Sequence, residues 1–118
     1  MTREEFDRIV EQAITALPER FARHLENIEI VVEDEPSREV LLDLGLDPRR
    51  DTLFGLYEGV PIDERADALL PLPDRIFIYY RPLIRTFRTP KRIQREIERT
   101  VLHEIGHVFG LDDDEMDE

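Results

Sequence analysis

The chain has 118 residues, the usual size of one domain, so we expect a single domain over residues 1–118. It has no cysteine, which excludes disulfides, thiolate zinc sites, iron–sulfur clusters and a cysteine nucleophile. Sixteen basic and 28 acidic residues give a net charge of −12, which argues against a nucleic-acid partner held through phosphates. Because no apolar run approaches the ~20 residues that cross a bilayer and the charged N-terminus lacks a signal-peptide pattern, we expect a cytoplasmic protein without a membrane partner.

The N-terminal half alternates helical and extended patterns. Thr2 and Glu5 form a capping-box pattern, and the apolar spacing behind them predicts an amphipathic helix over residues 3–17. The β-branched residues at 28–32 predict a strand. The other expected elements of this half are a short helical stretch at 18–27 and a short helix at 37–44 that Gly45 ends.

The second half predicts two strands and one long helix. Residues 53–60 are apolar with two glycines and indicate a strand with a turn or bulge, and residues 61–74 are a proline-rich loop. Residues 76–80 are apolar on both alternating faces, which favours a strand that is covered on both sides. After a basic and polar stretch that follows Pro82, Thr89 and Pro90 begin a long helix that Gly110 ends.

This last helix carries a His-Glu-x-x-His pattern. His103 and His107 lie one turn apart, about 6 Å along the axis and about 40° around it, so both imidazoles can bind one zinc ion. Glu104 lies about 100° from His103, beside such a metal and not on it, where its carboxylate can take a proton from a zinc-activated water. The pattern predicts two metal ligands and a general base. The alternative is that His103 and His107 bind no metal and are only surface residues of a C-terminal helix.

A third protein ligand is needed to complete a zinc site. Eleven residues follow His107, so we expect a downstream ligand to come from this short tail. Gly110 lets the chain leave the helix, and Asp113 follows at the ligand spacing of metzincins, with Asp in place of their third His. Three neighbouring carboxylates are disfavoured by spacing but not eliminated: Asp112, Asp114 and Glu115. Two histidines and a carboxylate also bind Fe, Mn or Co, so the ligand set alone does not select zinc.

With these motifs the sequence resembles the small, single-domain bacterial zincin-like metallopeptidases, or minimal zincins. The resemblance covers nearly the whole chain and runs through residues 31–37, 53–61, 76–83 and 100–113. Members often have a second His directly after the second ligand, where this chain has Val108. The resemblance implies an α+β fold, a small mixed sheet packed with helices, with the motif on a C-terminal active-site helix. It also implies a zinc-peptidase-like site.

Several other residues have both a functional and a plain interpretation. Tyr57, Tyr79 and Tyr80 are possible hydroxyl donors to an oxyanion, although core packing is favoured for each. Glu58 is a possible partner of a ligand histidine, but an exposed turn residue is favoured, and His24 is expected on the surface. The arginines that precede the site either bind a substrate carboxylate or, as we prefer, pair with the acidic N-terminal half: Arg81, Arg85, Arg88, Arg92, Arg95 and Arg99.

Three functions compete. The favoured one is a zinc-dependent peptidase with a peptide or protein substrate. The alternative is a metal-binding protein with little or no turnover, in which zinc stabilises the fold. A metal-dependent endoribonuclease is disfavoured, because the rRNA-maturation family with a similar ligand spacing has His third and lacks Glu after the first His. The net charge of −12 also opposes it, with the net +6 of residues 75–99 as its only support. The oligomeric state does not follow from the sequence.

Overall fold

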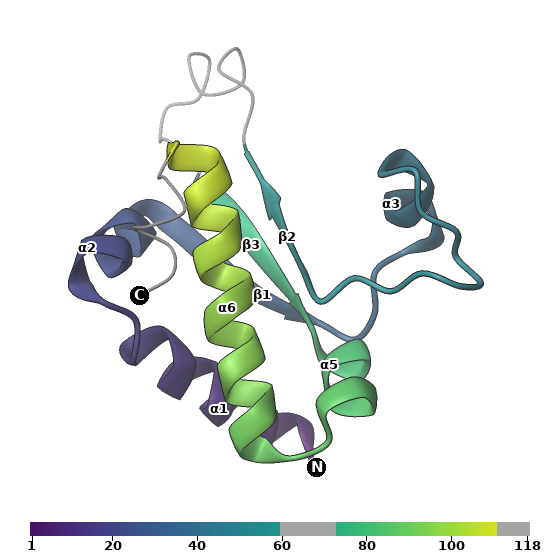
Figure 1. The fold of residues 1–118 in the computed structure, drawn as a ribbon, viewed down its shortest axis with the longest axis horizontal. Coiled ribbons are helices and arrows are strands. Elements are labelled where there is room, and N and C mark those ends of the chain that lie inside the picture. The colour runs from purple at the N-terminus through teal and green to yellow at the C-terminus, as the bar shows by residue number, and fades with distance from the viewer. Residues whose placement is uncertain (60–72, 111–118) are drawn as a thin grey trace.

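A computed structural model describes residues 1–59 and 73–110 of the chain. Figure 1 shows the arrangement of the elements. In chain order they are α1 (Arg3–Thr15), α2 (Glu19–Ala22), the 3-10 helix η1 (Arg23–Asn27), β1 (Ile28–Glu33), α3 (Arg38–Asp43), β2 (Gly55–Glu58), β3 (Asp74–Tyr79), α5 (Tyr80–Phe87) and α6 (Pro90–Phe109).

The strands form a mixed sheet in the order β1-β3-β2. β1 runs parallel to β3 with Ile30 opposite Ile76, and β2 runs antiparallel to β3 with Leu56 opposite Phe77. β3 is therefore the central strand and β2 lies at an edge. The fold is α+β with a small mixed sheet, as the sequence predicted.

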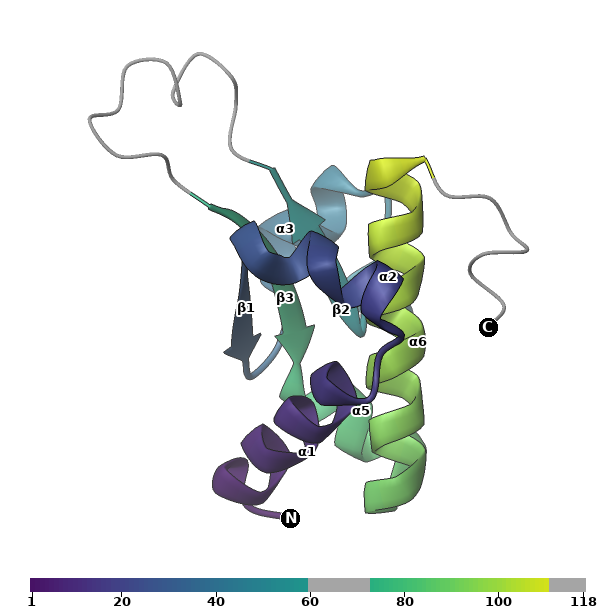
Figure 2. The same ribbon diagram turned by 90° about the vertical axis from the view of Figure 1, so that its left-hand side faces the viewer.

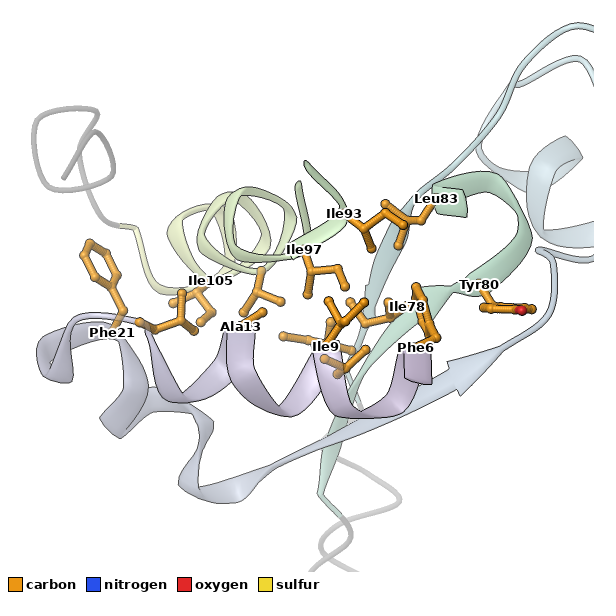
Figure 3. Close-up of a cluster of buried hydrophobic side chains, with 14 residues drawn as sticks. Phe6, Ile9, Ala13, Phe21, Ile78, Tyr80, Leu83, Ile93, Ile97 and Ile105 are labelled. Carbon is orange, nitrogen blue, oxygen red and sulfur yellow. The ribbon is translucent and has the colours of Figure 1, made fainter. Parts of the chain in front are cut away.

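The helices α1 and α6 pack against each other on one face of the sheet (Figure 2). Their apolar stripes and the inward side chains of β3 form one core cluster (Figure 3). Burial of these side chains away from water supplies the main stabilisation of the fold. Its fully buried members include Phe6, Ala13, Ile76, Ile78, Leu83, Ile93, Ile97, Val101 and Ile105.

Polar contacts attach the N-terminal helix to the sheet and to α5. The Arg3 guanidinium donates to the Val32 carbonyl at 2.7 Å and pairs with Asp34 at 2.6 Å, just beyond the end of β1. The Tyr80 hydroxyl donates to the Met1 carbonyl at 2.5 Å, and its ring meets Phe6 edge-on at 4.9 Å between centroids. These contacts fix α1, and through it the packing surface on which α6 lies.

The structure differs from the sequence prediction mainly after β3. The strand was expected at residues 76–80, but it begins at Asp74 and ends at Tyr79. Tyr80 and the polar stretch after it instead form the helix α5. Pro82 lies in the first turn of this helix, where its missing N–H is not required. Tyr80 and Leu83 are buried on its inner side, so the helical spacing of these side chains outweighs the basic composition around them.

Other boundaries shift by a few residues. α1 ends at Thr15, two residues before the expected end, although Leu17 is still buried. β2 covers Gly55–Glu58 and not the whole of 53–60, and most of the expected loop at 61–74 lies outside the described residues. Among the described helices, none combines the length and the apolar character that spanning a bilayer requires.

Candidate metal centre

The histidine pair lies on α6, the longest helix of the described chain. Its start is capped by Thr89, whose hydroxyl accepts from the Arg92 N–H at 3.3 Å, with Pro90 in the first turn. It ends at Gly110, which adopts a left-handed conformation with φ of 67° and donates its N–H to the Gly106 carbonyl. Both predicted ends are confirmed.

The buried side of α6 holds the histidine pair in place. Its inward side chains recur every fourth residue and have no exposed surface: Ile93, Ile97, Val101 and Ile105. They pack on α1, so this face cannot rotate away from the core (Figure 3). The opposite side of the helix is thereby held in solvent, and His103 and His107 lie there, both exposed.

The structure brings the two imidazoles together. Their ring centroids are 4.3 Å apart, with 47° between the ring planes. Side chains so close on one exposed face suit a shared metal ion, because a neutral imidazole is a good ligand for zinc and for related transition metals. The donor set in the described residues therefore fits two ligands of a zinc ion.

Glu104 follows His103 in the helix and is half-buried. Its position about 100° around the axis from His103 places it on the flank of the histidine face, between that face and the core side. A carboxylate there lies beside the histidine pair and does not compete with either imidazole for the same position.

The predicted third ligand cannot be placed in the same way. Asp113 and its alternatives Asp112, Asp114 and Glu115 lie outside the described residues. Within residues 1–59 and 73–110, no group of three or more His, Asp or Glu side chains is arranged to hold a metal ion. The described part of the site is thus the His103–His107 pair, and Asp113 remains a prediction.

The edge strand β2 lies beside the histidine face. A Cβ added to Gly55 would meet the Thr100 Cγ2 at 2.6 Å and the Phe77 carbonyl oxygen at 2.9 Å, so this glycine lets β2 approach α6. The Tyr79 N–H donates to the Phe54 carbonyl at 3.0 Å. In an antiparallel pair, the backbone N–H and C=O groups of successive residues point alternately toward and away from the partner strand. Because Phe54 bonds to β3, the N–H and C=O groups of the next residue, Gly55, point away from it.

A cavity of about 470 Å³ opens between the start of β2 and the polar side of α6. His103 lies on its wall, so the cavity adjoins the candidate metal centre. The other residues that line it are Leu53, Phe54, Gly55, Glu96, Arg99 and Thr100.

The three tyrosines have structural roles. Tyr57 donates its hydroxyl to the Asp74 carboxylate, and Tyr80 donates to Met1. Tyr79 is 2% exposed. Burial raises the pKa of Tyr79 to about 12, and the negative charges of Glu33 and Glu58 act in the same direction. The interpretation as packing residues therefore holds, and Tyr79 remains protonated at neutral pH.

Two further residues can now be placed. Glu58 is exposed, as favoured, but it is the last residue of strand β2, opposite Arg75 of β3, and not a turn residue. His24, expected on the surface, is half-buried, because its ring stacks on Phe109 at 4.4 Å between centroids. The polar sequence around His24 contains no signal for this contact, which joins η1 to the last residue of α6.

Two of the arginines that precede the site can be compared. Arg85 pairs with Glu35 at 2.6 Å, which agrees with pairing to the acidic N-terminal half. Arg99 instead lies on the cavity wall with His103. The two arginines, which look alike in the sequence, therefore have different surroundings.

Comparison with known proteins supports the zincin resemblance. The family model described as zincin-like metallopeptidase matches residues 25–118. A solved structure of a conserved hypothetical protein from Thermus thermophilus is similar in fold, with a TM-score of 0.58 and 24% identity over 92% of this chain and 94% of that chain. No curated protein sequence matches the chain.

The matched region includes the whole of the sheet, α6 and the His-Glu-x-x-His pattern. The fold, the exposed histidine pair and the family match agree with one another. The chain therefore belongs to the zincin-like metallopeptidase family.

Proposed function

We propose that this protein is a zinc-dependent peptidase in which His103, His107 and Asp113 hold the metal ion and Glu104 is the general base. The observation that carries the proposal is the His103–His107 pair, with imidazoles 4.3 Å apart on an exposed face of α6 and a carboxylate next to it. Membership of the zincin-like metallopeptidase family supports zinc as the metal. The function proposed here is thus hydrolysis of peptide bonds.

Each residue then has a defined task. Zinc, when bound, supplies Lewis acidity that polarises the peptide carbonyl and lowers the pKa of a water molecule. Glu104 accepts the proton of the water whose oxygen attacks the carbonyl carbon. The same carboxylate then delivers that proton to the amide nitrogen as the C–N bond breaks, so that the products are a carboxylic acid and an amine.

The substrate proposed here is an extended peptide or protein segment. β2 is an edge strand, and the backbone groups of Gly55 point away from β3. An extended chain can add to such an edge through main-chain hydrogen bonds, which bring its peptide bonds alongside α6. A nucleic-acid substrate is disfavoured by the net charge of −12.

The test is the Glu104→Gln variant, which keeps the shape of the side chain and removes its basicity. We expect zinc binding, measured by metal analysis after gel filtration, to be retained. Hydrolysis of a fluorogenic peptide library should fall by a factor of about 10²–10⁴, the usual contribution of a general base. Unchanged turnover would show that Glu104 is not the base.

Glu98→Gln is the matched control, because Glu98 lies on the same helix, is also half-buried and points away from the histidine face. It should keep both zinc and activity. A protein that melts at a much lower temperature in chelator, yet cleaves no peptide of the library, would instead favour metal binding without turnover.

A further inference from the structure

The cavity beside His103 contains a cation that the proposed mechanism does not use. Arg99 lies four residues before His103 on α6, about 6 Å along the helix axis and about 40° around it, so both side chains leave the same face. Both line the cavity of about 470 Å³ against the start of β2. A peptide with its scissile bond at the histidine pair would therefore place a neighbouring group close to Arg99.

Arg99 differs from the arginines that form ion pairs between segments of the fold. Arg3 and Arg85 each form an ion pair at 2.6 Å with a carboxylate of another segment. Within residues 1–59 and 73–110, Arg99 makes no ion pair, and its side chain is exposed. Glu96, three residues earlier and on the same cavity wall, is not paired with it in this part of the chain. With respect to the described residues, the guanidinium thus keeps its donors available on the cavity wall.

We propose that this cavity is a specificity subsite in which Arg99 binds a carboxylate of the peptide. The inference rests on the proposed peptidase function and names the class of substrate: peptides with an acid group next to the scissile bond. A guanidinium can bind a carboxylate with two parallel hydrogen bonds, which gives orientation as well as attraction.

The negative charge of Glu96, which also lines the cavity, should weaken the preference for a substrate carboxylate. Glu96 lies seven residues before His103, about 10 Å along the axis, and so is farther from the scissile bond than Arg99. A carboxylate near the bond meets Arg99 first and is repelled by Glu96 from a greater distance. The two residues should therefore have opposite effects on the preference, with that of Arg99 the larger.

The carboxylate has two possible sources, an Asp or Glu side chain or the free C-terminus of the peptide. Four short peptide hydroxamates can separate them, since the hydroxamate binds zinc and fixes each probe at the metal. They carry Glu or Gln at one position and end in a free acid or an amide. Binding to the zinc-loaded protein is measured by titration calorimetry, and the Arg99 Nε–H resonance is followed by NMR.

We expect a carboxylate probe to bind roughly fivefold to tenfold more tightly than its amide partner and to shift the Arg99 resonance. Arg99→Gln should abolish this ratio, and Glu96→Gln should increase it. Arg95→Gln, on an exposed arginine that does not line the cavity, should leave it unchanged. Whichever pair differs, Glu against Gln or acid against amide, identifies the source of the carboxylate.

Equal binding of all four probes to the wild-type protein would overturn the subsite and leave the peptidase proposal intact. A preference that survives in Arg99→Gln would overturn it as well. Binding of none of the four to the zinc-loaded protein would overturn the peptidase function, and the subsite with it.

Discussion

The two sides of α6 differ in almost every physical respect. The inner side is a row of isoleucine and valine side chains with no exposed surface, packed on α1 and β3. The outer side carries Arg99, His103 and His107, all exposed. Because both sides belong to one helix, the packing of the inner side determines the direction in which the outer side chains point without contributing to their chemistry. Stability and candidate function are therefore separable by substitution on a single element.

The largest effect on stability is expected on the inner side. Ile97→Ala removes a fully buried side chain between α6 and α1 and leaves a cavity, so the free energy of unfolding should fall by about 2–5 kcal/mol. Urea denaturation of the metal-free protein measures this change. Arg95→Ala on the exposed surface is the control and should change it by less than about 0.5 kcal/mol. Equal effects of the two variants would show that the two sides are not distinct.

An intermediate effect is expected where α6 meets the edge strand. Gly55→Ala would push a methyl group against Thr100 and the Phe77 carbonyl, which should cost about 1–3 kcal/mol of unfolding free energy. Gly59→Ala is the matched control, because the neighbours of its added Cβ lie at 3.8 and 3.9 Å, in ordinary contact. Adding Thr100→Ser to Gly55→Ala should recover part of the loss. A Gly55 variant as stable as the Gly59 variant would mean that β2 and α6 are not in close contact.

The smallest effect on stability is expected on the outer side. His103→Ala removes an exposed side chain, so the metal-free protein should unfold within about 0.5 kcal/mol of the wild type. The stabilisation by added zinc, measured as the shift in melting temperature, should disappear, because one of two adjacent imidazoles is gone. Arg92→Ala, exposed on the same helix, should keep the zinc shift. A zinc shift that persists in His103→Ala would remove His103 from the ligand set.

How far the sequence predicts this molecule depends on the kind of contact. α6 was predicted from end to end because its capping threonine, its apolar spacing and its terminal glycine act locally. The position of the histidines on that helix followed in the same way. These features need no knowledge of the rest of the fold.

Features that depend on distant partners were harder to predict. α5 was not predicted, because the arginines and Pro82 in this segment are untypical of a buried helix. Its buried side depends on a distant contact, the packing of Tyr80 on Phe6. The stacking of His24 on Phe109 joins residues 85 positions apart, for which local sequence patterns carry no information. The different surroundings of Arg85 and Arg99 likewise depend on the tertiary fold.

The stack of His24 on Phe109 bears on how the metal centre is held. The last fully buried isoleucine of α6 is Ile105, and beyond it Val108 and Phe109 are 45% and 41% exposed. His107 thus lies in the turn where the helix leaves the core, and helix ends have low local stability. A metal ion can bind His107 only when this turn is ordered. The apparent affinity of the protein for the metal ion therefore includes the free energy of ordering the turn. η1 would therefore tune the affinity of the centre by pre-organising the helix end through the stack of His24 on Phe109.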